Sequence, residues 1–512
     1  MNKKLQSLCL VLGLSGLIMF SSCSPDNDGE SYNIAPIPII KPNIVFYGLT
    51  NSNQLVKLNA NVPGTVISTI AITGLAPVEK IIAIDFRPAT GQLYGLGSTS
   101  HLYVINQETG SALIVNPIAF TPALSGPMAG FDFNPTVDRI RIVTYQGQNL
   151  RVNPETGLVV AVDAPINPSA NIAGSAYTNS FSGATTTTLY DIDFVNRNLY
   201  IQNPPNNGTV AIVGGGFQLA SSTVDGGFDI SPDNSVALAS YNYGGVAGLM
   251  QVDLTSGLTV DLGSLTTPLI GLAIPTVPVA YSIENNANTN NLLIFNLQVP
   301  VIPISKNVTG LQPNEKILGI DMRPATGQLY ALGSTSRLYT INMGSGAATV
   351  VGPVFSTLLS GTSFGFDFNP TVDRVRVVSN TGQNLRLSPI TGDIAAIDVA
   401  LNPGVTNVSA AAYTNNFAGA TTTTLYVIDH TTGILYIQNP PNNGTLTAVG
   451  SLGVTVSPDN GFDIGGVSGK AYAFFNTGST NKIYTINLAT GAATEFTTIP
   501  ATTRAFCVGL GL

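Results

Sequence analysis

The sequence predicts an all-β protein built as two tandem five-bladed β-propellers, and three observations support this fold class. Charged residues make up 9% of the 512 residues, while 53 glycines and 32 prolines indicate a chain rich in turns. Several long motifs occur twice. Inside each half, a shorter pattern returns every 44 to 53 residues, which is the length of a four-stranded propeller blade. The chain is long enough for two such domains, each with its own core.

The long motifs indicate a tandem duplication with almost no insertion between the copies. Their first residues lie 235 or 236 positions apart: RPATGQLY starts at Arg87 and Arg323, GFDFNPTVDR at Gly130 and Gly365, GATTTTLY at Gly183 and Gly419, and IQNPPNNGT at Ile201 and Ile437. The predicted domains are residues 43–275 and 279–512. The short connector between them is stiffened by Pro275 and Pro278.

The shorter pattern predicts the innermost strand of every blade. Its aligned positions are Asp85, Asp132, Ala176, Asp229 and Ala273 in the first copy, and Asp321, Asp367, Ala412, Asp463 and Gly511 in the second. Each copy starts without an innermost strand and ends with a surplus one, so we expect its two ends to join and close a five-bladed ring. The alternative is one ten-bladed ring, in which residues 270–274 turn directly into residues 279–283.

The turn before the last strand of several blades has a recurring form. An Asx residue is followed by Thr or Ser and then Gly, as in Asn106, Thr109 and Gly110. The Asx side chain accepts backbone N–H groups, and the glycine takes the positive φ that closes the turn. These glycines are therefore predicted to be structural, because no strand-to-helix context indicates a phosphate loop.

The GFDFNP and TTTTLY motifs, present in both copies, resemble those of a bacterial family known as domain of unknown function 4394. The resemblance covers nearly all of the chain after the N-terminal segment. It implies two copies of one domain. It implies no activity, cofactor or catalytic residue.

The N-terminus predicts export and lipidation. Lys3 and Lys4 precede an apolar stretch at 5–19, and Ser21 and Ser22 precede Cys23, which resembles a bacterial lipobox although Phe20 departs from the usual leucine. We expect a signal peptide at 1–22 and a lipid anchor on Cys23. The alternative is an ordinary cleaved signal with an incidental cysteine.

Residues 23–42 are expected to form a flexible tether, whose acidic start, SPDNDGE, resembles the surface-export signal of some Bacteroidetes lipoproteins. The predicted location is therefore the cell envelope, at the outer membrane and lipid-anchored. The acidic start favours exposure on the cell surface, and an orientation toward the periplasm is the alternative.

Charge and residue counts exclude some classes of function. A net charge of −8 and only 20 Lys and Arg argue against nucleic acid as a partner. The two histidines, His101 and His430, occupy unrelated positions in the repeat, which excludes a shared histidine-based catalytic or metal site.

Two groups of side chains are candidates for a site. The first consists of charged residues on the predicted inner strands: Asp132, Arg139 and Arg141, with Asp367, Arg374 and Arg376 in the second copy. Because both faces of a propeller sheet are buried against other blades, we predict a structural network there. A ligand site lining the channel is the alternative, and Asp85 with Arg87 and Asp321 with Arg323 are interpreted in the same way.

The second group is neutral and lies in the fourth blade, on the expanded turn at 179–187 and the Asn-rich turn at 203–208. Both turns lie at the same end of the sheet, so we expect them to meet on one rim of each ring. The candidate binding residues are Asn179, Asn203, Asn206 and Asn207, repeated as Asn415, Asn439, Asn442 and Asn443.

These observations predict a surface lipoprotein that binds or scaffolds a glycan, peptide or protein. The alternative is a calcium-assisted glycan-active enzyme on a propeller scaffold. No catalytic residue or metal site is predicted from the sequence, and calcium is the one cofactor that the alternative would require.

Overall fold

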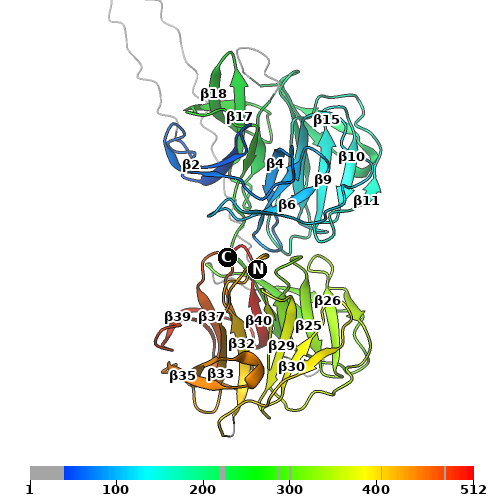
Figure 1. Ribbon diagram of the computed structural model, residues 1–512. Coiled ribbons are helices and arrows are strands. Elements are labelled where there is room, and N and C mark those ends of the chain that lie inside the picture. Colours follow the sequence, from blue (N-terminus) through cyan, green and yellow to red (C-terminus); the bar gives the residue numbers. More distant parts are fainter. Residues whose placement is uncertain (1–39, 218–224, 286–288, 299–302, 405, 478–479) are drawn as a thin grey trace, which may run out of the picture. The chain divides into compact units, whose positions relative to one another are not determined.

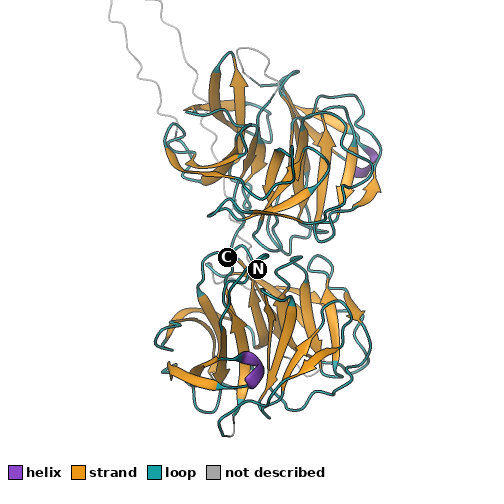
Figure 2. Ribbon diagram, in the orientation of Figure 1, coloured by secondary structure: helices purple, strands orange, loops and turns teal. Residues whose placement is uncertain are grey.

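A computed structural model describes residues 40–217, 225–285, 289–298, 303–404, 406–477 and 480–512. The predicted signal peptide, Cys23 and most of the predicted tether lie outside these residues. The described secondary structure is almost entirely strands, and two short 3-10 helices, η1 (Pro205–Asn207) and η2 (Pro441–Asn443), interrupt it (Figure 2). No helix in the described part of the chain is long and apolar enough to cross a membrane.

The strands of the first copy form five antiparallel four-stranded sheets, which are the blades of one ring (Figure 1). From the innermost strand outward, the blades are β4 (Ile81–Phe86), β5 (Leu93–Gly97), β6 (Leu102–Ile105) and β7 (Ala112–Ile114); β8 (Ala129–Asn134), β9 (Arg139–Thr144), β10 (Asn149–Val152) and β11 (Val159–Val162); β12 (Gly174–Tyr177), β13 (Leu189–Asp193), β14 (Asn198–Gln202) and β15 (Val210–Val213); β16 (Phe228–Ile230), β17 (Ala237–Tyr243), β18 (Val246–Val252) and β19 (Thr259–Ser264); β20 (Gly271–Ala273), β1 (Val45–Leu49), β2 (Gln54–Asn59) and β3 (Val66–Ala71).

The second copy repeats this arrangement with five further sheets. Its blades are β24 (Ile317–Met322), β25 (Leu329–Gly333), β26 (Arg337–Ile341) and β27 (Ala348–Val351); β28 (Phe364–Asn369), β29 (Arg374–Ser379), β30 (Asn384–Leu387) and β31 (Ile394–Ile397); β32 (Val408–Tyr413), β33 (Leu425–Asp429), β34 (Ile434–Gln438) and β35 (Leu446–Ser451); β36 (Asn460–Ile464), β37 (Ala471–Thr477), β38 (Thr480–Ile486) and β39 (Ala493–Ile499); β40 (Thr503–Val508), β21 (Val279–Glu284), β22 (Asn291–Asn296) and β23 (Ile304–Asn307).

Each ring closes on itself. The last strand of the first copy, β20, pairs with β1, so that Tyr47 lies opposite Ala273. The last strand of the second copy, β40, pairs with β21, and Tyr281 lies opposite Cys507. The prediction of two five-bladed propellers is therefore confirmed, and the single ten-bladed ring is wrong.

The pairing of β40 corrects one predicted position. Sequence identity aligned Gly511 with Ala273, but the residue that occupies the place of Ala273 is Cys507, because each lies opposite the matching tyrosine of the first strand. Gly511 follows the end of β40, and its N–H donates to the carbonyl of Thr90 in the first ring (2.8 Å).

The core lies between neighbouring blades. Tyr94 of β5 packs edge-on against Phe133 of β8 with ring centroids 5.1 Å apart, and Tyr330 packs against Phe368 at the same distance in the second ring. Apolar side chains from two adjacent blades thus pack together in one hydrophobic cluster. This packing fixes every innermost strand beside the next one around the ring.

The recurring turns have the predicted structure. The N–H groups of Glu108 and Thr109 both donate to Asn106 Oδ1 at 3.0 Å, and Gly110 has a φ of 73°. The glycine closes a turn between strands β6 and β7, as the prediction of a structural role requires.

Candidate functional site

Arg141 on β9 is the centre of a buried network that joins two neighbouring blades of the first ring, β8–β11 and β12–β15. Its Nη1 donates to Asp163 Oδ2 (2.6 Å) and to Asn149 Oδ1 (2.7 Å). Its Nη2 donates to Asn206 Oδ1 (2.7 Å), and its Nε donates to the Tyr177 hydroxyl (3.3 Å). A buried guanidinium requires this many acceptors, because each unpaired N–H would cost its full desolvation penalty.

The second ring repeats the network with the same distances. Arg376 donates to Asp398 (2.6 Å), Asn384 (2.7 Å), Asn442 (2.7 Å) and the Tyr413 hydroxyl (3.3 Å). The arginine network is therefore a property of the domain and occurs in both copies.

The other charged candidates do not join this network directly. Asp132 and Arg141 lie opposite one another on β8 and β9, yet Asp132 Oδ1 accepts the N–H of Tyr177 (3.1 Å). Asp367 likewise accepts the N–H of Tyr413 (2.8 Å). Arg139 donates to the carbonyl of Asp138 (2.7 Å), and its counterpart Arg374 donates to that of Asp373 (2.8 Å).

The Asn-rich turn of the fourth blade in sequence order, β12–β15, belongs to the arginine network. Asn206 holds Arg141, and the carbonyl of Pro205 accepts amide N–H groups from Asn149 (2.9 Å) and Gln202 (2.7 Å). Asn203 and Asn207 in the same turn are exposed. In the second ring Asn442 holds Arg376, while Asn439 and Asn443 are exposed.

The expanded turn is held by the opposite neighbouring blade. The N–H of Asn179 donates to Asn234 Oδ1, and Asn234 Nδ2 donates back to Asn179 Oδ1, both at 2.7 Å. The hydrogen bonds of the described residues thus tie this turn to the β16–β17 loop and the Asn-rich turn to β9 and β10. In the second ring, Asn415 donates to the carbonyl of Thr422 within its own turn (2.9 Å).

Three buried aspartates meet at the centre of each ring. One carboxylate oxygen from each of Asp85, Asp132 and Asp229 lies within 4.8 Å of the others, and Asp321, Asp367 and Asp463 repeat the cluster. Each of these aspartates also accepts the backbone N–H of the next inner strand that follows it, as Asp85 does from Phe133 (2.9 Å) and Asp229 from Ile274 (2.5 Å). We call the two clusters the aspartate triads.

The triads are electrostatically unfavourable when fully ionised. Burial, followed by repulsion from Asp229, raises the pKa of Asp85 well above its usual range, and burial with repulsion from Asp85 and Asp229 does the same to the pKa of Asp132. Burial raises the pKa of Asp229, and of Asp463 in the second ring, to about 7. Either shared protons or a hard cation such as calcium would relieve the repulsion.

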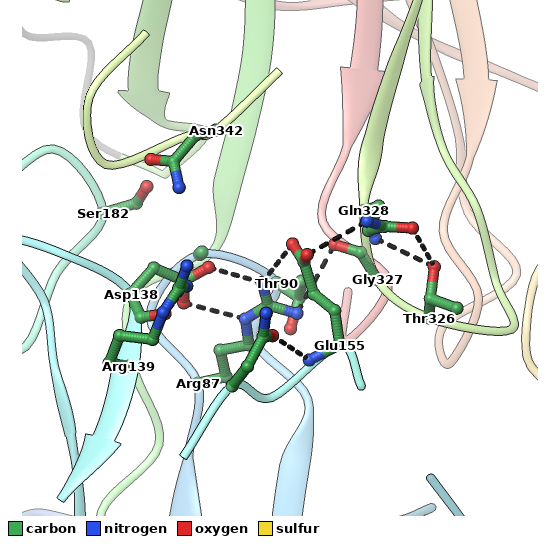
Figure 3. A network of polar contacts seen from close by, with 12 residues as sticks. Arg87, Thr90, Asp138, Arg139, Glu155, Ser182, Thr326, Gly327, Gln328 and Asn342 are labelled. Atoms are coloured by element: carbon green, nitrogen blue, oxygen red, sulfur yellow. Dashed lines mark hydrogen bonds and ion pairs between the residues drawn. The ribbon is translucent and has the colours of Figure 1, made fainter. Parts of the chain in front are cut away.

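A third polar network joins the two rings (Figure 3). The side chain of Arg87 is 0% exposed; it pairs with Asp138 and with Glu155 (3.2 Å), and donates to the carbonyl of Gly327 in the second ring (3.4 Å). Gln328 of the second ring donates to the other oxygen of Glu155 (3.0 Å). Arg323, the counterpart of Arg87, pairs with Asp373 and remains 11% exposed.

Sequence reasoning missed Glu155 and Ser182 at this junction. Both stand where the copies differ, since the second copy has Ile390 and Ala418 at these positions. Ser182 Oγ lies 2.6 Å from the Tyr281 hydroxyl, and Tyr281 donates to the carbonyl of Ala89 (2.8 Å). A difference between otherwise matched copies was therefore the available signal for this contact.

The family model for the Domain of unknown function (DUF4394) matches residues 54–273 and again residues 291–508. The chain belongs to the DUF4394 family. Its two DUF4394 domains are the two rings. The first match runs from the start of β2 to the end of β20, and the second runs from the start of β22 to the end of β40. No curated protein sequence matches the chain.

Similar solved structures include one that is described as a propeller. The Dos1 propeller is 13% identical with a TM-score of 0.26, over 66% of this chain and 92% of that one. PorZ, a surface component of the type IX secretion system of Porphyromonas gingivalis, is 14% identical with a TM-score of 0.26, over 88% of this chain and 65% of that one. A protein from Lactobacillus plantarum is 14% identical with a TM-score of 0.28, over 64% and 95%.

We predict that Asn206 stabilises the first DUF4394 domain. Asn206→Ala leaves Arg141 Nη2 without its acceptor and should lower the free energy of unfolding by about 1–2 kcal/mol. Asn207→Ala, an exposed change in the same turn, is the control and should stay within about 0.5 kcal/mol of the parent. Chemical denaturation of the mature protein measures both, and equal effects of the two substitutions would contradict the assignment.

We also predict that stability falls as pH rises, because the aspartate triads bind protons more tightly in the folded protein than in the unfolded chain. Their contribution is complete below about pH 4, the unfolded pKa. It is lost as the pH rises through about 7, the pKa of Asp229 and Asp463. Thermal denaturation between about pH 5 and pH 8 in the presence of EDTA measures the slope.

The double substitution Asp132→Asn and Asp367→Asn tests the origin of that slope. Each asparagine keeps an oxygen for the backbone N–H of Tyr177 or Tyr413 but removes one charge, so the dependence on pH should flatten. With calcium in place of EDTA, a bound cation would instead make stability rise with pH, since it binds the ionised carboxylates. Stability that rises with pH in EDTA would refute the proton interpretation.

Proposed function

We propose that this chain is a lipoprotein of the cell envelope, acylated at Cys23, whose two rings form a binding or scaffolding module for a glycan, peptide or protein. The proposal rests on one observation: each ring presents an exposed Asn-rich turn that the same buried arginine network holds in place. Arg141 and Asn149 hold the first turn, and Arg376 and Asn384 hold the second.

A turn held in this way is suited to binding. Buried side-chain amides of Asn149 and Gln202 hold the carbonyl of Pro205, while Asn203 and Asn207 on the same turn are exposed. Fixing a loop before a ligand arrives reduces the entropy that binding must overcome. Side-chain amides both donate and accept hydrogen bonds, which matches the hydroxyls of a glycan or the backbone of a peptide.

The duplication strengthens the proposal. Asn439 and Asn443 repeat the exposed amides on the second ring. Two equal sites on one chain raise the apparent affinity for a ligand that carries repeated units. Glycans and fibrous or clustered proteins have this property.

The aspartate triads give less support to the alternative, an enzyme. A calcium-assisted mechanism would use carboxylates in the channel, but Asp85, Asp132 and Asp229 each accept backbone N–H groups between blades. Their arrangement favours a role in joining blades. We therefore propose binding as the activity of the rings.

The proposed location depends on the N-terminal sequence. Lys3 and Lys4, the apolar stretch and Cys23 constitute an export and acylation signal, and the acidic residues that follow favour transfer to the outer surface. We propose that the tether carries the rings away from the outer membrane.

Cys23→Ala should release the protein from the membrane. Acylation of Cys23 is the proposed anchor, so the variant should move from the detergent-soluble membrane fraction to the soluble fraction after cell lysis. Immunoblotting of the fractions measures the shift, with the parent protein as control. Equal membrane retention of parent and variant would rule out the anchor.

Binding should be tested by applying the mature protein to glycan and peptide arrays. The pair Asn203→Ala and Asn207→Ala, or the pair Asn439→Ala and Asn443→Ala, should reduce apparent affinity for the strongest array ligand by about a hundredfold through loss of avidity. All four substitutions together should abolish the signal without changing the melting temperature. Full binding by the fourfold variant would eliminate these turns as the site.

A further inference from the structure

A cavity of about 450 Å³ lies where the expanded turn of the first ring meets the second ring. Phe181 contributes from the turn, and Ile294, Phe295 and Ile304 contribute from β22 and β23. Its size is within the range of small-ligand sites, and its lining is mainly apolar, as in such sites. Asn296 and Asp233 add polar groups to the lining.

The wall from the first ring is held rigidly. Phe181 lies on the same turn as Asn179, and Asp233 lies on the same loop as Asn234. The reciprocal hydrogen bonds between Asn179 and Asn234 join this turn to this loop. Because Tyr281 donates its hydroxyl proton to the carbonyl of Ala89, Ser182 must donate to the oxygen of Tyr281. This chain of hydrogen bonds fixes the turn against the second ring.

Packing brings the turn into close contact with the opposite wall. A Cβ placed on Gly183, whose φ is 91°, would lie 2.9 Å from Ile304 Cδ1. At the matched position of the second ring, a Cβ on Gly419 would meet no atom within 4 Å. The same turn therefore forms a cavity wall in the first ring and faces open space in the second.

Asp233 supplies the charge of the cavity. It is exposed, and its Oδ1 accepts hydrogen bonds from the Ser231 hydroxyl (2.7 Å) and the Ser235 hydroxyl (2.8 Å). Partial burial opposes its ionisation, but these hydrogen bonds prevail and lower its pKa. The matching loop of the second copy, residues 465–470, reads GGVSGK and contains no acid.

We propose that this cavity binds an apolar group that carries a cationic amine, with the aromatic or aliphatic part between Phe181 and Phe295 and the ammonium beside Asp233. The ammonium gains the Asp233 carboxylate, and the apolar part gains contact with the two phenylalanine side chains that line the cavity. A hydrophobic side chain next to a lysine or a free N-terminus in a peptide has this chemistry. The site does not depend on the Asn-rich turns.

Three probes that share a phenylethyl group and differ in the charge of its substituent test the charge requirement. Isothermal titration of the mature Cys23→Ala protein should detect 2-phenylethylamine, while 2-phenylethanol should bind about tenfold more weakly and 3-phenylpropionate should not bind. Asp233→Asn keeps an oxygen for Ser231 and Ser235 and should reduce the affinity for the amine to that for the alcohol. Equal affinities for the amine and the alcohol in the parent protein would overturn the proposal.

Phe181→Ala and Phe417→Ala form a matched pair that tests the location. The two phenylalanines occupy the same position of the same turn, and each N–H donates to the asparagine carbonyl two residues earlier (2.6 and 2.7 Å). Phe181→Ala should abolish amine binding, and Phe417→Ala should leave it unchanged. Equal losses in the two variants, or no binding of the amine to the parent protein, would refute the site, whereas the array result above would be unaffected.

Discussion

In each ring the closing strand takes its hydrogen bonds from the first strand of the same copy, β20 from β1 and β40 from β21. Without these pairs, β1–β3 and β21–β23 would each lack an innermost strand, and the ring of blades would not be complete. Closure also sets the positions of all five inner strands. The aspartate triads, the arginine networks and the exposed turns are consequences of this constraint.

The centre of each ring combines a stabilising contact with an electrostatic cost. An aspartate that accepts the backbone N–H of the next blade joins two inner strands, as Asp85 joins Phe133. Three such carboxylates in one narrow channel repel one another, and burial favours their neutral forms. Ala176 and Ala273 occupy the two remaining inner positions of the first ring, so a channel with three acids rather than five limits this repulsion.

The duplication provides an internal comparison. Arg141 and Arg376 have the same partners at the same distances, because the arginine network lies wholly inside one domain. Arg87 and Arg323 differ, because only Arg87 is covered by contacts with the other ring. The matched network thus keeps its geometry inside each domain, whereas the contacts of Arg87 differ from those of Arg323 at the place where the rings meet.

The sequence by itself determined the features that depend on neighbours along the chain. The repeat length predicted four-stranded blades, the long motifs predicted two copies, and the Asx residues predicted the turns, as at Asn106 and Gly110. These signals are local, since a turn is formed by the hydrogen bonds of a few consecutive residues. The channel position of the aspartates also followed from the repeat.

Tertiary structure decided the partners of side chains and strands that are distant in sequence. Residue identity aligned Gly511 with Ala273, but pairing with β21 placed Cys507 there. The Asn-rich turn and the expanded turn follow strands at the same end of their sheet, but no local pattern indicated that Asn206 holds Arg141 of one neighbouring blade while Asn179 holds Asn234 of the other. A buried charge or amide takes whichever acceptor ring closure brings within hydrogen-bond distance, and that distance is set by packing between blades, which no local pattern encodes.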